Sequence, residues 1–373
     1  MIAPQFFIEK LLAGGIGFYA GVPDSLLKNM CAYMTDHLDS SQHVIAANEG
    51  GAVALAAGYH LATGQSGCVY MQNSGEGNAV NPLVSLMDSD VYHMPLLLLI
   101  GWRGRPGVHD EPQHVKQGKI TTGLLNTLGI NYDILSKEES VAARQIDKAL
   151  EHLNRNEMFA LIVEKDTFDS YTIQRQTPQQ YELGREEAIR IVASSIPDNA
   201  VIVSTTGMIS RELFEYRTAM GQGHERDFLT VGSMGHASQI ALGIALQQPQ
   251  RPVYCFDGDG AAIMHMGNMA IVGTHAPRNF VHVVFNNGAH DSVGGQPTVG
   301  HEIDLVEIAH ALHYHHASAV WTSEDLTRKL EEIGGDGPEL LEVRVRKGNR
   351  KDLGRPTTTP IENKEALMQF LKK

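Results

Sequence analysis

Short apolar runs alternate with amphipathic segments along most of this chain. Such alternation is typical of parallel strands joined by crossover helices, so the predicted fold class is α/β. In the first half we expect strands at residues 17–22, 43–47, 67–72, 95–101 and 159–164. Residues 49–64 form a Gly- and Ala-rich helical segment, which we expect to end at Gly64.

A second α/β series follows a polar, aperiodic stretch. Residues 165–187 lack a core face, which predicts a linker within them. Beyond it we expect strands at residues 200–205, 228–233, 253–259, 280–287 and 339–345. Residues 361–373 have the pattern of an amphipathic helix. The sequence therefore predicts two open parallel-sheet domains, 1–168 and 185–373, joined by a linker at 169–184.

Composition restricts the class of partner. The 373 residues are 42% hydrophobic and carry a formal net charge of -13, which argues against nucleic acid or an anionic membrane. The N-terminal segment lacks the basic start of a signal peptide, and the longest apolar run, 94–102, is too short to span a bilayer. Three widely spaced cysteines without metal-binding spacing predict buried reduced thiols in a cytoplasmic protein.

Candidate chemistry gathers where the strands of the second half end. Open parallel sheets bind ligands beyond the carboxyl ends of their strands. Asp259 ends one apolar strand and Asn286 and Asn287 end the next, so right-handed crossover brings them to one sheet edge. Carboxylate and carboxamide oxygens suit Mg²⁺. Gly258 and Gly260 allow the backbone to approach a phosphate closely.

Two other interpretations of this motif stay open at this point. A Gly-Asp-Gly sequence alone is a common tight turn. Asp257 and Asp259 also have the spacing of the DxD nucleophile of metal-dependent phosphohydrolases. However, Ala261 and Ala262 stand where that motif usually has a hydroxyl residue, and the motif lies deep in the chain.

Gly-Asp-Gly followed at this spacing by Asn-Asn resembles the metal- and diphosphate-binding motif of thiamine diphosphate enzymes. The resemblance implies that thiamine diphosphate is the cofactor. It also implies that Asp259, Asn287 and the backbone carbonyl of Ala289 bind Mg²⁺. A pyrimidine-binding domain would come first and a pyrophosphate-binding domain second, with no central third domain.

A second motif of this family lies in the other predicted domain. Glu49 stands between a strand and the Gly- and Ala-rich helix, where the family has a glutamate bonded to N1′ of the aminopyrimidine ring. A carboxyl that shares its proton with this ring activates the cofactor. A glutamate in the first turn of a helix is also favourable by itself. The joint match in both domains outweighs that alternative.

Weaker matches complete the expected cofactor site. In the Gly-Ser-Met-Gly turn that begins at Gly232, Met234 resembles the apolar side chain that holds the cofactor in its bent form. Core packing is the alternative for this methionine. Thr206 and Gly207 resemble the family's strand-end loop near the diphosphate.

Within the family, residues 21–27, 73–83, 101–118 and 286–298 most closely resemble the phosphonopyruvate decarboxylases. Sulfopyruvate decarboxylases, which generally have two separate subunits, are the nearest alternative. The resemblance implies decarboxylation of 3-phosphonopyruvate to phosphonoacetaldehyde and CO₂, in phosphonate biosynthesis. It also implies a homo-oligomer, at least a dimer, whose active sites combine Glu49 of one subunit with Asp259 of another.

Such a substrate needs clustered cations in an acidic chain, and residues 101–118 supply them. Arg103 follows a strand directly and is suited to bidentate contact with a phosphonate. Arg105 and His109 are further candidates for substrate binding.

Three more polar residues are candidates around the reacting atoms. Asp24 follows a strand and either relays protons or caps the next helix. His290 and Asp291 lie just past the metal motif, in a Gly-rich segment that could close as a lid. We expect these two to contact or protonate the substrate.

Overall fold

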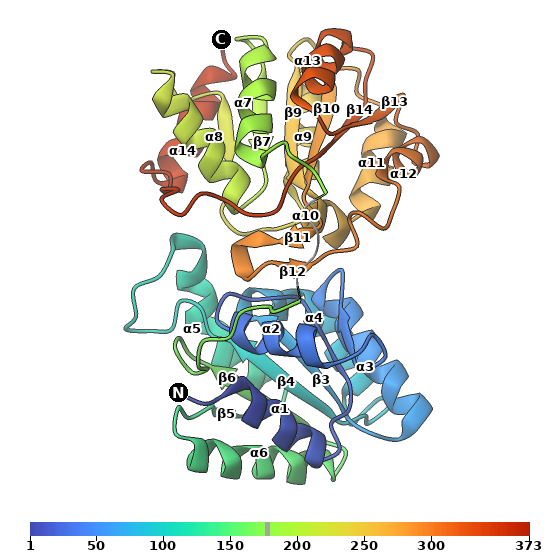
Figure 1. Cartoon of the computed structure of the whole chain (residues 1–373), viewed down its shortest axis with the longest axis vertical. Coiled ribbons are helices and arrows are strands. Elements are labelled where there is room, and N and C mark those ends of the chain that lie inside the picture. Colours follow the sequence, from blue (N-terminus) through green and yellow to red (C-terminus); the bar gives the residue numbers. More distant parts are fainter. Residues whose placement is uncertain (176–179) are drawn as a thin grey trace. The chain divides into compact units, whose positions relative to one another are not determined.

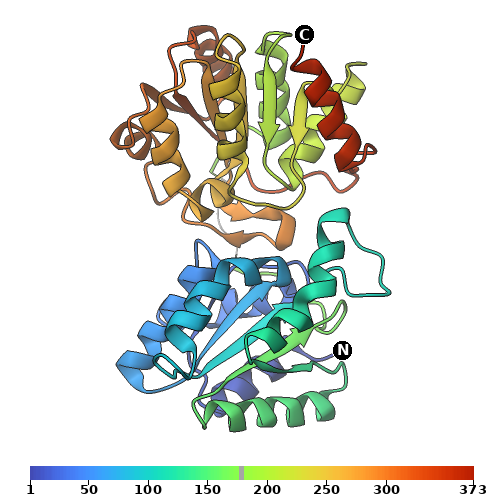
Figure 2. The same ribbon diagram turned by 180° about the vertical axis from the view of Figure 1, so that it is seen from behind.

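A computed structural model describes residues 1–175 and 180–373. They form two compact units, Met1–Gln176 and Thr177–Lys373. In each unit a parallel sheet lies between two layers of helices (Figures 1 and 2). The predicted linker 169–184 contains residues 176–179, which lie outside the described residues.

The first unit has a six-stranded parallel sheet in the order β2-β1-β3-β4-β6-β5. Its strands are β1 (Tyr19–Gly21), β2 (His43–Ile45), β3 (Gly67–Gln72), β4 (Leu96–Gly101), β5 (Asn131–Ile134) and β6 (Met158–Val163). Its α-helices are α1 (Pro4–Ala13), α2 (Lys28–His37), α3 (Glu49–Thr63), α4 (Glu76–Pro82), α5 (Pro112–Thr127) and α6 (Glu139–Leu153). A short 3₁₀ turn, η1 (Asn73–Gly75), joins β3 to α4.

Helices cover both faces of this sheet, which explains why its central strands are almost wholly apolar. Side chains of α1, α2 and α6 pack on one face, and those of α3, α4 and α5 pack on the other. Every residue of β4 is buried. The two cores therefore fix the carboxyl ends of the strands, from which the loops of the candidate site start.

The second unit repeats this design with the strand order β13-β14-β10-β9-β7-β8, again all parallel. Its sheet strands are β7 (Val201–Ser204), β8 (Asp227–Leu229), β9 (Val253–Gly258), β10 (Phe280–Asn286), β13 (His316–Val320) and β14 (Glu339–Arg344). Helices α7 (Arg185–Ser195), α8 (Met208–Ala219) and α13 (Ser323–Glu332) pack on one face. The opposite face contacts α9 (Ala237–Gln247), α11 (Gly267–His275), α12 (Leu305–Ala311) and α14 (Pro360–Phe370).

The predicted α/β class is confirmed, and all ten predicted strands are present. The sequence pattern missed β5 and β13, which are edge strands with partly exposed residues and therefore no continuous apolar run. It also missed a short antiparallel hairpin of β11 (Ala289–His290) and β12 (Gln296–Pro297). This hairpin follows β10 and carries part of the candidate site.

Local signals explain where α3 begins and ends. The Asn48 side chain accepts a hydrogen bond from the Gly51 N–H at 2.8 Å, which caps the helix start. Gly64 closes the helix with a φ of 71°, a backbone conformation that glycine adopts without strain. Throughout the described ranges, no helix has both the length and the apolar character needed to cross a membrane.

Candidate functional site

The carboxyl ends of β9 and β10 bring Asp259 and Asn287 together in the second unit. Phe285 pairs with Gly258 across the two strands, so the residues that follow them are neighbours at one sheet edge. Asp259 begins the short helix α10 (Asp259–Met264) and is 2% exposed. Its Oδ2 accepts a hydrogen bond from the Thr298 hydroxyl, and its Oδ1 accepts one from the backbone N–H of Asn287 at 3.4 Å.

Burial raises the pKa of Asp259 to about 6, and hydrogen bonds from Thr298 and from backbone N–H groups offset only part of this effect. These hydrogen-bond partners are all uncharged. A buried carboxylate with neutral partners is costly, and a divalent cation placed against it would favour its charged form. The electrostatics of Asp259 thus fit a metal ligand.

Asn286, the other asparagine of the pair, braces the turn from inside. Its Nδ2 donates to the Gly300 carbonyl and to the Glu342 carboxylate, each at 2.7 Å. Its Oδ1 accepts from the Gly288 N–H at 3.1 Å. Asn286 is fully buried, and these three contacts hold the turn that carries Asn287.

Asn287 is held in a different way. Its Nδ2 donates to Asp291 at 2.6 Å, and its Oδ1 accepts from the Ala289 N–H at 3.1 Å. The oxygen has a second lone pair beyond that single contact. Its amide group is therefore oriented, with the nitrogen on the Asp291 side.

The β11–β12 hairpin encloses this turn. The Thr298 N–H donates to the Gly288 carbonyl at 3.0 Å, and a side chain at Gly300 would come within 2.6 Å of the Asp259 carboxylate. The donor atoms expected to bind a cation here are all oxygens: the Asp259 carboxylate, the Asn287 side-chain amide and the Ala289 carbonyl. A set of hard oxygen donors fits Mg²⁺ and does not favour softer transition metals.

His290 lies on β11 over the start of α10. A side chain at Gly260 would come within 2.9 Å of its imidazole Cε1. Burial lowers the pKa of His290 to about 4, so its imidazole is neutral near pH 7. In this state it holds one proton on one ring nitrogen and can accept another on the second.

The expected diphosphate loops lie at the same edge of the sheet. The Gly232 N–H donates to Thr206 Oγ1 at 3.0 Å, which ties the loops after β7 and β8 together. Gly207, just before α8, has a φ of 95°, where a side chain would be strained. Met234 is only partly buried and lies outside the hydrophobic core clusters of the described residues, which argues against the core-packing alternative.

Glu49 occupies the corresponding edge of the first unit. It is the first residue of α3 and is 5% exposed. Its Oε2 accepts a hydrogen bond from Asn78 Nδ2 at 2.8 Å. A side chain at Gly75 would overlap the Glu49 carboxyl, so the absence of a side chain there makes room for the acid.

Asn78 and Gly75 are site residues that the sequence analysis did not single out. Both lie in the segment 73–83, where a glycine precedes a short helix after a buried strand. Their place just after a buried strand is a signal that the sequence does contain. However, nothing in the linear pattern relates either residue to Glu49. That relation appears only when α3 packs against α4.

Asp24 is fully buried beside the end of β4. Its Oδ1 accepts from Gln72 Nε2 at 2.7 Å and its Oδ2 from the Leu26 N–H at 2.9 Å. Helix α2 begins at Lys28 and has no side-chain cap, so Asp24 closes a turn and does not cap the helix. Burial raises the pKa of Asp24, and the hydrogen bonds from Gln72 and Leu26 only partly oppose this.

Arg103 is engaged by an acid from its own loop. Its Nε and Nη2 donate to Asp110 at 2.8 and 2.5 Å, and its Nη1 donates to Ser25 at 2.8 Å. Burial of Asp110 opposes its ionisation, but hydrogen bonds from Arg103 and the backbone outweigh burial and hold its pKa well below the usual range. Arg105 forms an ion pair with Glu164 at 2.7 Å, and His109 is exposed.

A further buried acid, Glu76, lies next to Gly75 and was not predicted. It is 4% exposed, and neither carboxyl oxygen has a hydrogen-bond partner among the described residues. Burial raises the pKa of Glu76 to about 8, and Thr121 opposes this only slightly. The Thr121 hydroxyl instead donates to the Gln117 carbonyl at 2.8 Å.

We expect Glu76 to make the first unit less stable as pH rises. Because its pKa in the folded state lies above the ordinary value of 4.5, stability is full below about pH 4.5 and is lost as pH rises through about 8. Glu76→Gln removes this dependence. Urea unfolding should show the variant gaining roughly 3 kcal/mol over the wild type between pH 5 and pH 8. Equal slopes of stability against pH in both proteins would contradict the assignment.

The phosphohydrolase alternative finds little support in the geometry. Asp257 is 1% exposed, and its Oδ1 accepts from the Gly258 N–H at 3.1 Å. Its other oxygen lies 3.5 Å from His282, beside Cys255 in the core. A nucleophile must reach its substrate, and this carboxylate faces the interior of the unit.

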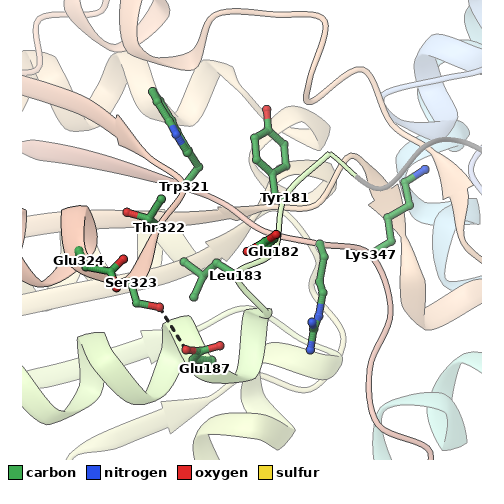
Figure 3. Close-up of a pocket in the computed structure, with 10 residues that line it drawn as sticks. Tyr181, Glu182, Leu183, Glu187, Trp321, Thr322, Ser323, Glu324 and Lys347 are labelled. Atoms are coloured by element: carbon green, nitrogen blue, oxygen red, sulfur yellow. Dashed lines mark hydrogen bonds between the residues drawn. The ribbon is translucent and has the colours of Figure 1, made fainter.

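A separate cleft of about 900 Å³ opens in the second unit (Figure 3). Residues before α7 and around the end of β13 line it, including Tyr181 and Trp321. Figure 3 shows the Ser323 hydroxyl bonded to Glu187, at 3.1 Å. None of the predicted site residues is among those that line this cleft in the described part of the chain.

Comparison with known proteins adds two family matches. Residues 1–124 match the thiamine pyrophosphate enzyme, N-terminal TPP binding domain, and residues 205–343 match the C-terminal TPP binding domain. Thiamine pyrophosphate is another name for thiamine diphosphate. The two matched segments contain Glu49 and the Asp259–Asn287 pair, respectively.

Individual relatives resemble the chain over its whole length. It is 34% identical to phosphonopyruvate decarboxylase from Streptomyces hygroscopicus, across 99% of this chain and 94% of that protein. It is 26% identical to sulfopyruvate decarboxylase from Methanosarcina acetivorans, across 97% of this chain and 95% of that protein. Sulfopyruvate decarboxylase subunit beta from Methanothermobacter thermautotrophicus is 34% identical across 51% of this chain and 95% of its own length.

Proposed function

Because this chain belongs to the thiamine diphosphate-dependent carboxy-lyases, we propose that it converts 3-phosphonopyruvate into phosphonoacetaldehyde and CO₂. The observation that carries this substrate assignment is the similarity to a phosphonopyruvate decarboxylase over nearly the full length of both chains. Such a reaction would act in phosphonate biosynthesis, because loss of CO₂ draws an unfavourable C–P bond-forming step forward.

Mg²⁺ is the proposed metal, held by the Asp259 carboxylate, the Asn287 amide oxygen and the Ala289 carbonyl. The raised pKa of Asp259 and the all-oxygen donor set support this assignment. The loops that carry Gly258 and Gly260, together with those at Thr206, Gly207 and Gly232, would receive the diphosphate. Met234 would contact the middle of the cofactor.

When bound, thiamine diphosphate supplies the electron sink that takes up the electrons of the breaking C–C bond. Glu49 would hold a proton at the aminopyrimidine ring, and Asn78 keeps its carboxyl in place at 2.8 Å. Asp24 is buried with a raised pKa, so it can hold a proton near the reacting atoms. His290 is the other candidate to move a proton, because its neutral ring can both donate and accept.

The proposed phosphonate-binding groups lie after β4. Arg103 uses three of its five N–H donors within the protein, which leaves two for a phosphonate. Asp110 holds the guanidinium in a fixed plane, and fixed donors bind an anion at a lower cost in entropy. Arg105 and His109 are more exposed and would add positive charge at the mouth of the site.

We also propose a homo-oligomer, at least a dimer, in which Glu49 of one subunit and Asp259 of another serve one active site. The named subunit beta of a sulfopyruvate decarboxylase spans only about half of this chain. That relative therefore supports the view that the two halves are separable parts of one catalytic assembly.

The substrate is tested by measuring kcat/KM for phosphonopyruvate and sulfopyruvate side by side, with aldehyde detection. We expect phosphonopyruvate to be preferred by about tenfold or more, because a phosphonate can carry a second negative charge toward Arg103. Activity should require both thiamine diphosphate and Mg²⁺. A higher kcat/KM for sulfopyruvate would establish the second candidate, which the relative from Methanosarcina acetivorans favours.

A further inference from the structure

Asp291 is bound within the protein at the very turn that carries the proposed metal ligands. Its Oδ2 accepts hydrogen bonds from Asn287 Nδ2 at 2.6 Å, from Arg185 at 3.0 Å and from the Gly348 N–H at 2.9 Å. The side chain of Asp291 is 9% exposed. Three donors converge on one carboxylate oxygen, so the position of that oxygen is tightly determined.

Arg185 connects this carboxylate to the core of the second unit. It begins α7, and its side chain is 5% exposed. Its Nε and Nη2 donate to the Glu212 carboxylate of α8 at 2.9 and 3.0 Å, while its Nη1 donates to Asp291. Because the bidentate pair with Glu212 fixes the plane of the guanidinium, the direction of its third N–H donor is also fixed. Arg185 is thus anchored between α7 and α8 and holds the Asp291 carboxylate in a fixed position.

The contact to Asn287 has a chemical consequence. A carboxylate oxygen can only accept hydrogen bonds, so it selects the NH₂ end of the Asn287 amide. The C=O end must then point the other way, into the turn that contains Ala289. If the amide rotated by half a turn, its oxygen would meet the Asp291 carboxylate and its nitrogen would face the cation, and both contacts would be repulsive.

We propose that Asp291, held by Arg185, is a positioning residue that fixes which atom of Asn287 faces the metal. This inference rests on the proposed metal site and extends it to two residues beyond the ligands. It also replaces the expectation that Asp291 contacts the substrate, since Oδ2 of Asp291 is already committed to protein donors. Groups that orient a metal ligand in this way commonly alter metal affinity about 10- to 100-fold when they are removed.

The test is the affinity for Mg²⁺ of the full-length protein with saturating thiamine diphosphate and no substrate, by isothermal titration calorimetry. In Asp291→Ala, no acceptor remains opposite Nδ2 of Asn287, so both orientations of the ligand amide become accessible. We expect a dissociation constant about 10- to 100-fold higher than that of the wild type. Arg185→Lys should raise it as well, because a lysine cannot bind Glu212 in bidentate fashion and Asp291 together.

Asp227→Asn is the matched control. Arg217 and Asp227 form a bidentate ion pair in the same unit that is fully buried, at 2.9 and 3.1 Å, away from the metal turn. This control should lower the melting temperature and leave the affinity for Mg²⁺ within about twofold of the wild type. A merely structural role of Asp291 predicts that Asp291→Ala behaves like this control, which would overturn the inference.

The result also separates this inference from the proposed function. If the wild type binds no Mg²⁺ with thiamine diphosphate present, both fail. If the wild type binds and Asp291→Ala binds equally well, only the positioning role fails. Should Asp291→Ala not fold, Asp291→Glu gives the same comparison, because it keeps the charge while displacing the acceptor oxygen, and an unchanged affinity would again overturn the inference.

Discussion

Glu49→Gln is expected to lower kcat by about 10²- to 10⁴-fold, the usual contribution of a positioned acid or base. Glutamine keeps the shape of the side chain and can still contact Asn78, but it cannot share a proton with the aminopyrimidine ring. The loss should therefore appear in kcat, with little change in the affinity for thiamine diphosphate. Steady-state kinetics and calorimetric titration of the cofactor measure the two quantities separately.

The matched control for this substitution is Glu76→Gln, which removes the buried carboxyl of the residue that directly follows Gly75. We expect its kcat near pH 7 to stay within a few-fold of the wild type. If Glu49→Gln retained more than a tenth of the wild-type kcat, the proton-sharing role assigned to Glu49 would be wrong.

Asp259→Ala is expected to abolish activity by a different route, through loss of cofactor binding. Removing a direct ligand should weaken binding of Mg²⁺ and thiamine diphosphate by more than the roughly 10- to 100-fold typical of an indirect partner. Calorimetry with both components present measures this loss. Asp304→Ala, which removes a cap of α12 in the same unit, should cost about 1 kcal/mol of stability and leave binding unchanged.

Mixing the two inactive variants tests the shared site. If Glu49 and Asp259 of different subunits serve one site, exchange of subunits creates some sites with neither substitution. In an equimolar mixture, random assortment makes half of the dimers mixed, and one of the two sites in each mixed dimer is intact. We then expect the mixture to recover up to about a quarter of the activity of the same amount of wild-type protein. No recovery after verified exchange would argue for sites within single chains.

The sequence alone predicted the strand ends that carry the site, because buried parallel strands leave long apolar runs and their ends are marked by abrupt polar residues. Asp259 and Asn287 are such ends, and the structure brings their backbones to neighbouring positions. The edge strands β5 and β13 left no such run, since part of their surface faces solvent. Apolar runs mark the buried central strands clearly, and they are absent from these two edge strands.

What the sequence could not supply was the identity of partners across the fold. Nothing in the linear pattern relates Arg185, at the start of the second unit, to Asp291 more than a hundred residues later. Nor does it show that Glu76 lacks a hydrogen-bond partner among the described residues while Glu49 contacts Asn78. Such facts depend on side-chain packing between helices and loops, which no local spacing encodes.

The hairpin of β11 and β12 connects two parts of the proposed metal site. Ala289 lies on its first strand, and Thr298, the hydroxyl donor to Asp259, directly follows its second. Unzipping these few residues would withdraw one oxygen ligand and release the other from its orienting partner in a single movement. We therefore expect cation exchange at the proposed site to be coupled to fraying of the hairpin, with a rate limited by that opening rather than by diffusion of the ion.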